Sequence, residues 1–256
     1  MANLMINGRS SAGYPPISDP VNMNVLIPCA GLGNRFKNAG YDTPKPLIDV
    51  CGKPMIQRVV ENIGNIGHYT LVVLNDQELI YRNVLDEILP NFTLLTVPHV
   101  TEGAACTCLI ASEYIRDQPL IITDSDKIME WDANHFVDWL GRKNPEGALV
   151  TYTSASPKNS FVELSKGRVV RVVEKEPISD IACTGAYYWS NGSDFILSAQ
   201  HMIQKNKRVN NEFYVAPVYN EMIDRRILIY PIQRHWPLGT PEDLEKYRAE
   251  HCGISS

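Results

Sequence analysis

A glycine-rich segment with basic residues close behind it could bind phosphate groups. It follows residues 25–28, an apolar run that predicts a buried strand. Gly31 and Gly33 lack the Cβ atoms that would keep an anion away from backbone N–H groups. Arg35 and Lys45 add fixed positive charges a few residues further on. Together these residues predict a cradle for the phosphates of a nucleoside triphosphate.

Two acidic residues after a second buried strand could hold a divalent cation. Asp124 and Asp126 follow the apolar run 120–122. Residues placed after such a strand lie at the carboxyl edge of the sheet, where open α/β sheets bind ligands. Mg²⁺ is commonly held by one or two carboxylates together with phosphate oxygens and water. We therefore expect Mg²⁺ as the cofactor, with an Asx turn that only ends the strand as the structural alternative.

The spacing of the glycines excludes two common phosphate-binding motifs. The dinucleotide-binding fingerprint requires a third glycine where Phe36 stands, and the Gly-Lys-Ser/Thr ending of a Walker loop is absent. The structural alternative for Gly31 and Gly33 is a tight strand-to-helix turn with basic residues nearby by chance.

Residues 29–36 and 44–47 carry a resemblance to a known family. They read Cys-Ala-Gly-Leu-Gly-Asn-Arg-Phe and Pro-Lys-Pro-Leu, and the pair resembles the signature of the nucleotidylyltransferase (pyrophosphorylase) family. Further motifs occur in the family's order, so the resemblance covers about residues 23–250. Some relatives carry a C-terminal β-helix. Because no hexapeptide array follows residue 250, we expect the short form without it.

The resemblance implies a role for each candidate site residue. Arg35 and Lys45 would stabilise the triphosphate and the leaving pyrophosphate, and Lys175 would position the acceptor phosphate. The nucleotide-binding set comprises Cys29, Ala30, Gly31, Gly33, Glu102, Gly103 and Ala104. The acceptor-binding set comprises Ser160, Glu174, Thr184, Gly185 and Glu212.

The chain departs from the family pattern at the metal and acceptor positions. Asp126 matches the first metal-binding aspartate of the family, but Pro237 stands where many relatives have a second one. Either Asp124 supplies the second carboxylate, which we favour, or the ion is held by Asp126, phosphates and water. Ser160 stands roughly where sugar-using relatives carry a glycine, which leaves the acceptor open.

The motifs predict an enzyme that transfers a nucleotide to a phosphorylated acceptor. A nucleoside triphosphate and a phosphorylated sugar, or a small phosphorylated alcohol, would give the nucleoside-diphosphate product and pyrophosphate by in-line attack on the α-phosphate. One alternative is a glycosyltransferase that uses Asp124-Ser125-Asp126 as an Asp-x-Asp motif. Another is an inactive relative that senses nucleotide, supported only by the missing late aspartate.

Composition limits the other functions of this 256-residue chain. Its net charge of −5, with both signs spread along the chain, argues against a nucleic-acid partner. The sequence contains neither a long apolar run typical of a membrane span nor a signal sequence. We expect all six cysteines to be reduced and the protein to be cytoplasmic. A homodimer is suggested by the family alone.

The pattern of elements predicts an α/β fold. Apolar strands such as 71–74 and 120–122 alternate with helices such as 54–63 and 78–89, which indicates a Rossmann-like, mainly parallel sheet with helices on both faces. After about Gly147, strand-like runs separated by short polar breaks predict an antiparallel acceptor-binding lobe. We expect a flexible arm over 1–22 and a single catalytic domain over 23–256.

Overall fold

A mixed sheet organises the computed structural model, which describes residues 23–253. The predicted arm over 1–22 and the last three residues lie outside the described residues. The main strand order is β10-β6-β9-β4-β1-β2-β3. These strands are β1 (Asn24–Pro28), β2 (His68–Leu74), β3 (Phe92–Val97), β4 (Leu120–Thr123), β6 (Gly147–Thr153), β9 (Ile181–Trp189) and β10 (Ile227–Pro231).

Parallel pairing joins β1 to β2 and β4, β2 to β3, and β10 to β6, whereas β9 runs antiparallel between β4 and β6. The predicted mainly parallel sheet is therefore confirmed.

The helices are α1 (Asn34–Asn38), α2 (Met55–Ile63), α3 (Glu78–Ile88), α4 (Ala104–Leu109), α5 (Ser112–Ile115), α6 (Ala133–Lys143), α7 (Gly192–Gln204) and α8 (Pro241–His251), with short 3-10 turns η1 (Lys45–Leu47), η2 (Asn75–Gln77) and η3 (Ala216–Met222).

Both faces of the sheet are covered by helices because its central strands are apolar on both sides. Val25 and Ile27 pack into one buried cluster with side chains of α2, α3 and α6. Leu26 points the other way, into a second cluster with residues of α4, α5 and α7. Alternation along β1 thus divides the core into two layers, one on each face of the sheet.

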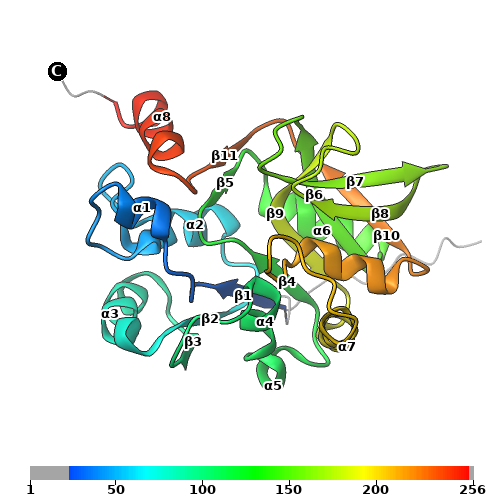
Figure 1. Cartoon of the computed structure of the whole chain (residues 1–256), viewed down its shortest axis with the longest axis horizontal. Coiled ribbons are helices and arrows are strands. Elements are labelled where there is room, and N and C mark those ends of the chain that lie inside the picture. The colour runs from blue at the N-terminus through cyan, green and yellow to red at the C-terminus, as the bar shows by residue number, and fades with distance from the viewer. Residues whose placement is uncertain (1–22, 254–256) are drawn as a thin grey trace, which may run out of the picture.

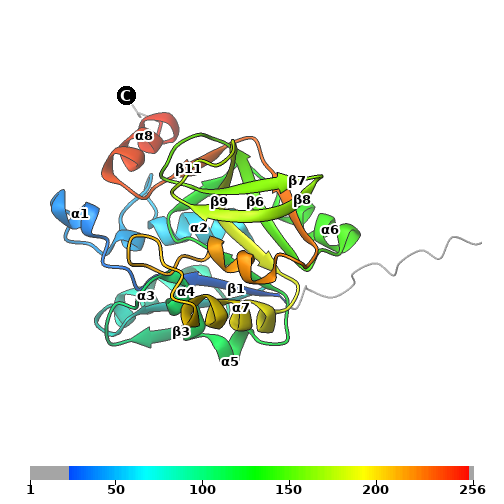
Figure 2. The same ribbon diagram turned by 45° about the vertical axis from the view of Figure 1, so that its right-hand side comes forward.

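The antiparallel lobe is built on a hairpin of β7 (Ser160–Ser165) and β8 (Arg168–Glu174), and β7 also pairs with β9. Lys166 and Gly167 form its turn. Their φ values of 50° and 76° are both positive, as a tight two-residue hairpin turn requires. In both views this hairpin lies on the opposite side of the molecule from α1 and α3 (Figures 1 and 2).

A small second sheet joins the late part of the chain to the acidic motif. Within residues 23–253, β5 (Lys127–Met129) pairs antiparallel with β11 (His235–Pro237), and β11 leads into α8. Thr240 caps α8 by accepting a hydrogen bond from the Asp243 N–H. The pairing of β5 with β11 was not predicted, because each strand has only three residues.

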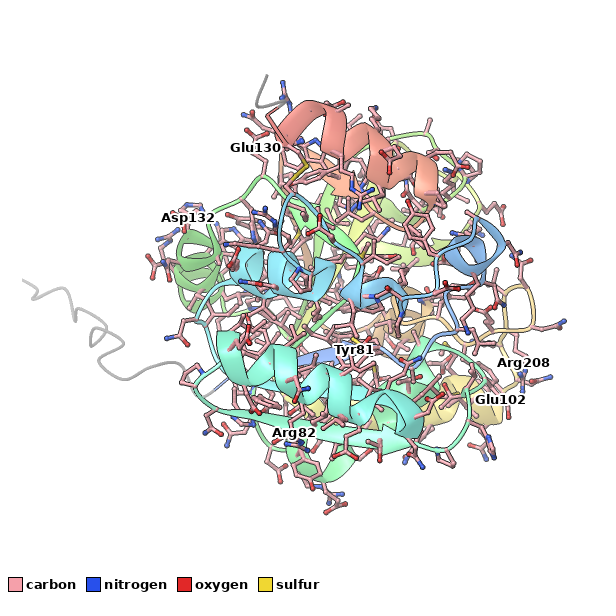
Figure 3. The ribbon with its side chains drawn as sticks, turned by 90° about the vertical axis from the view of Figure 1, so that its left-hand side faces the viewer. Tyr81, Arg82, Glu102, Glu130, Asp132 and Arg208 are labelled. Atoms are coloured by element: carbon pink, nitrogen blue, oxygen red, sulfur yellow. A yellow bond between two sulfur atoms is a disulfide. The ribbon has the colours of Figure 1, made fainter. Side chains whose placement is uncertain are left out.

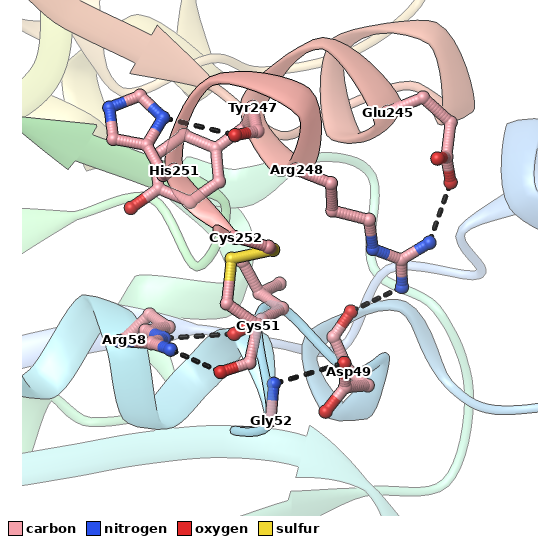
Figure 4. Close-up of a disulfide and its surroundings, with 10 residues drawn as sticks. Asp49, Cys51, Gly52, Arg58, Glu245, Tyr247, Arg248, His251 and Cys252 are labelled. Carbon is pink, nitrogen blue, oxygen red and sulfur yellow. Dashed lines mark hydrogen bonds and ion pairs between the residues drawn. A yellow bond between two sulfur atoms is a disulfide. The ribbon is translucent and has the colours of Figure 1, made fainter. Parts of the chain in front are cut away.

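A disulfide joins Cys51 to Cys252, so the prediction that all six cysteines are reduced is wrong (Figure 4). The two residues are 201 positions apart in sequence, but the Asp49–Pro54 turn and the end of α8 meet in space with a Cα–Cα distance of 5.0 Å. Arg248 donates from α8 to the Asp49 carbonyl at the same place. The other four cysteines are free, as expected. Because two of the cysteines form a disulfide, the cysteines no longer support the predicted cytoplasmic location.

No helix within residues 23–253 combines the length and the apolar character needed to cross a membrane.

We expect the Cys252→Ser substitution to lower the free energy of unfolding by about 2–5 kcal/mol under oxidising conditions, because a bond that closes a long loop restricts the unfolded chain. Urea unfolding with and without dithiothreitol measures this loss. Cys106→Ser, at a free and half-buried thiol, is the matched control. An unchanged urea midpoint in Cys252→Ser would contradict the pairing.

Candidate active site

A cleft of about 470 Å³ opens at the carboxyl ends of β1 and β4. It is walled by the loop before α1 on one side and by the β7–β8 hairpin and the segment after α7 on the other. The predicted site residues that line it are Gly33, Arg35, Lys45, Ala104, Asp124, Asp126, Ser160, Glu174, Lys175, Gly185 and Glu212.

Six predicted site residues do not line this cleft. They are Cys29, Ala30, Gly31, Glu102, Gly103 and Thr184. The Cys29 and Ala30 side chains are buried under the loop, and burial raises the pKa of the Cys29 thiol to about 12. Thr184 is buried in β9, where its hydroxyl donates to the Val150 carbonyl at 3.1 Å. Gly31 lies in open space, so its backbone remains accessible to a ligand.

The glycine-rich loop is held against the Pro-Lys-Pro-Leu turn. Gly33 is the N-cap of α1 and has a left-handed φ of 63°. A Cβ at this position would lie 3.1 Å from the Cβ of Lys45. Phe36 is buried and anchors α1 in a third apolar cluster with residues of α8. The loop therefore keeps the Arg35 side chain, which lines the cleft, on the same side as Lys45.

An ion pair joins the two motifs that carry the predicted chemistry. The Lys45 Nζ lies 2.7 Å from Asp126 Oδ2, and both side chains are largely shielded from solvent. Burial alone would raise the pKa of Asp126, but the charges of Lys45 and Lys127 outweigh it and hold that pKa well below its usual range. Asp126 is therefore a carboxylate at neutral pH.

Asp124 and Asp126 offer a donor set that fits Mg²⁺. Both line the cleft, and no hydrogen bond is made to the Asp124 carboxylate within the described part of the chain. Burial is the main cause that raises the pKa of Asp124. Among residues 23–253 no third acidic, histidine or cysteine side chain joins them in a cluster. A magnesium ion here would complete its shell with phosphate oxygens and water, as it usually does.

The segment that follows β11 packs directly on this acidic pair. The Leu238 N–H donates to the Asp126 carbonyl at 2.8 Å, and a Cβ on Gly239 would lie 3.0 Å from Asp126 Oδ2. Gly185, in β9, has a φ of 96°, and its Cβ would lie 2.4 Å from Asp124 Oδ2. Gly185 in β9 and Gly239 in the segment between β11 and α8 thus leave room for the two carboxylates.

The wall opposite the glycine-rich loop combines a buried acid with a lysine. Glu174 accepts a hydrogen bond from the Ser160 hydroxyl, and burial raises its pKa. Lys175, with a left-handed φ of 59°, donates to the Tyr214 hydroxyl, and its Nζ lies 4.1 Å from the centre of that ring. An acid that accepts hydrogen bonds beside a cation suits a ligand with both hydroxyl and phosphate groups.

Glu102 and Gly103 hold the hairpin that follows α7. The Phe213 N–H donates to the Glu102 carbonyl, and a Cβ on Gly103 would lie 2.5 Å from the Phe213 backbone. Arg208 pairs with the Glu102 carboxylate (Figure 3). The Arg208 guanidinium also lies over the Phe213 ring. The Glu102 side chain therefore lies at the surface, whereas Ala104 lines the cleft.

Sequence reasoning missed several residues that line the cleft. They include Lys127, Lys158, Asn159 and Tyr214. Lys127 directly follows Asp126, and Tyr214 stands two residues after Glu212, so proximity to a motif was the only available signal.

The cleft lies at the carboxyl edge of parallel strands, which is where open α/β sheets bind ligands. The chain belongs to the nucleotidyl transferase family, whose sequence pattern matches residues 25–248.

Two relatives and one solved structure show how far this similarity extends. Mannose-1-phosphate guanyltransferase beta-B of Xenopus laevis is 26% identical over 179 residues, which is 66% of this chain and 50% of that protein. The chain thus spans about half the length of this relative. UTP–glucose-1-phosphate uridylyltransferase AglF of Haloferax volcanii is 26% identical over 237 residues, 88% of this chain and 94% of that protein. A nucleoside-diphosphate-sugar pyrophosphorylase from Vibrio cholerae shares the fold, with a TM-score of 0.75, 21% identity, and coverage of 87% of this chain and 98% of that one.

We expect Gly185→Ala to be more destabilising than Gly167→Ala, although both glycines have left-handed backbones. Any side chain at φ of 76° or 96° costs about 1–2 kcal/mol, but only at Gly185 would the new methyl group collide with a neighbour, the Asp124 carboxylate. Urea unfolding of the two variants gives the difference. Equal losses would show that Asp124 moves aside freely.

Proposed function

We propose that the protein is a nucleotidylyltransferase that joins a nucleoside triphosphate to a phosphorylated sugar, or to a small phosphorylated alcohol, and releases pyrophosphate. The Lys45–Asp126 contact carries this proposal, because it links the glycine-rich loop to the acidic motif across from Glu174 and Lys175. Family membership and the named activities of the two relatives support the same reaction.

In the proposed reaction, an oxygen of the acceptor phosphate attacks the α-phosphorus of the triphosphate. A new P–O bond forms as the bond to the bridging oxygen breaks, and pyrophosphate leaves with the electron pair. The acceptor attacks as an anion, so no side chain acts as nucleophile. Arg35 and Lys45 bind the triphosphate, and Lys175 orients the acceptor phosphate. Asp124 and Asp126 would hold Mg²⁺, which when bound supplies charge neutralisation and alignment.

The two alternatives have less support. A glycosyltransferase would use the Asp124-Ser125-Asp126 segment for a nucleoside diphosphate sugar, but the cations of Arg35 and Lys45 suit a triphosphate, and the family match favours nucleotidyl transfer. The inactive-sensor alternative rested on Pro237. Because Asp124 and Asp126 both line the cleft, the chain has two carboxylates for a metal without a late aspartate.

A thermal-shift screen with CTP, UTP, dTTP, GTP and ATP and with the corresponding diphosphates, each with Mg²⁺ or with EDTA, tests nucleotide binding. A triphosphate at 100 times its dissociation constant stabilises the folded state by about 2.7 kcal/mol, which raises the melting temperature visibly. We expect one triphosphate to give a shift that EDTA removes. A shift only with a nucleoside diphosphate would favour the glycosyltransferase. Pyrophosphate release with a panel of phosphorylated sugars and alcohols then identifies the acceptor.

We expect Lys45→Ala and Asp126→Ala each to reduce the rate of pyrophosphate release by about two orders of magnitude or more, because each removes a charge that positions the triphosphate. Lys205→Ala is the matched control, since this exposed lysine does not line the cleft and its partner Glu221 keeps an ion pair with Lys207. A purified and folded variant with turnover like that of the unmodified protein would contradict the role of that residue.

A further inference from the structure

Lys127 lies on the floor of the cleft, where the small second sheet meets the acidic motif. It is the first residue of β5 and follows Asp126 directly. Its partner across the ladder is Pro237 in β11. The return of the chain through β11 thus fixes the backbone of Lys127 beside the two aspartates.

Close packing over Gly185 determines the path of the Lys127 side chain in the cleft. A Cβ on Gly185 would lie 3.2 Å from Lys127 Cγ and 2.4 Å from Asp124 Oδ2. The lysine stem and the Asp124 carboxylate therefore pass side by side over the same glycine. Glycine is needed there because a larger residue would displace one of the two.

Lys127 differs from the other lysines of the cleft because no partner occupies its ammonium group. Lys45 is paired with Asp126, Lys158 lies 3.7 Å from Asp243, and Lys175 is held by Tyr214. Within residues 23–253, no carboxylate oxygen lies within 4.0 Å of the Lys127 nitrogen, and the nitrogen donates no hydrogen bond. Lys127 is half-buried and lines the cleft, so its ammonium group is available to contact a ligand there.

Lys127 lines the same cleft as the residues of both walls. Arg35 and Lys45 line it on the nucleotide side, and Glu174 and Lys175 line it on the acceptor side. A lysine side chain is positively charged at neutral pH. Lys127 therefore adds a positive charge to the cleft that the two walls share.

The proposed reaction needs a cation at that place. The triphosphate and the acceptor phosphate are both anions, so they repel each other as they approach. We propose that Lys127 is a further catalytic residue, whose ammonium group contacts the phosphates where nucleotide and acceptor meet; this role rests on the proposed nucleotidyl transfer. Charge stabilisation of this kind acts on kcat more than on nucleotide affinity.

The test compares pyrophosphate release by the unmodified protein and by Lys127→Met, Lys127→Arg and Lys127→Ala. We expect Lys127→Met to lower kcat about 100-fold while the dissociation constant of the triphosphate, measured by titration calorimetry, changes less than about threefold. Lys127→Arg should keep more activity than Lys127→Met. Ethylammonium added to Lys127→Ala should restore part of the rate in a concentration-dependent way. Lys53→Met, at an exposed lysine paired with Glu61, controls for the loss of a charge.

Each outcome supports or overturns the proposed role of Lys127. If Lys127→Met folds and keeps kcat within about threefold of the unmodified protein, the role is overturned while nucleotidyl transfer stands. If Lys127→Met does not fold, rescue of Lys127→Ala by ethylammonium supports the role. If ethylammonium does not rescue Lys127→Ala and Lys127→Arg is also inactive, the role is overturned, because the lysine is then structural. No pyrophosphate release by the unmodified protein with any tested pair overturns the proposed function and this role together.

Discussion

The contact between Lys45 and Asp126 is the constraint on which the rest of the site depends. Two charges that are mostly shielded from water are costly to bury, and a distance of 2.7 Å offsets much of that cost. The contact connects the turn after α1 with the end of β4, which lie 81 residues apart. Gly33 packs against Lys45, and Gly239 packs against Asp126. Two further segments of the chain are therefore held close to this one ion pair.

Strand β9 connects the two halves of the molecule. It pairs antiparallel with β4 of the parallel half and with β6 of the lobe, and seven of its residues from Ala182 to Tyr188 are buried, as is Trp189. Such a strand cannot shift in register without exposing its apolar side chains. Because Gly185 lies in this strand beside Asp124, the same register places the lobe with Glu174 against the acidic motif. The core thus determines the width of the cleft.

The C-terminal helix depends on cross-links more than on apolar burial. Only Leu244 and Tyr247 of α8 are buried, in the third apolar cluster with Phe36 and Leu238. The disulfide and the Arg248 hydrogen bond fasten the end of this helix to the turn around Cys51. Since Leu238 also bonds the backbone of Asp126, the docking of α8 and the position of the acidic motif belong to one connected structure.

The sequence by itself determined most strands of the main sheet, several of the helices and the residues that begin each motif, but not the short strands β5 and β11. The apolar run of β1, the apolar periodicity of α2 and the proline at the start of α8 depend only on neighbours in the chain, so they could be recognised locally. The disulfide between Cys51 and Cys252, the Glu102–Arg208 pair and the place of Lys127 opposite Pro237 join residues more than 100 positions apart. Only the tertiary structure decided these, because residue types reveal which groups can interact, whereas the packing of distant strands and helices brings them within bonding distance.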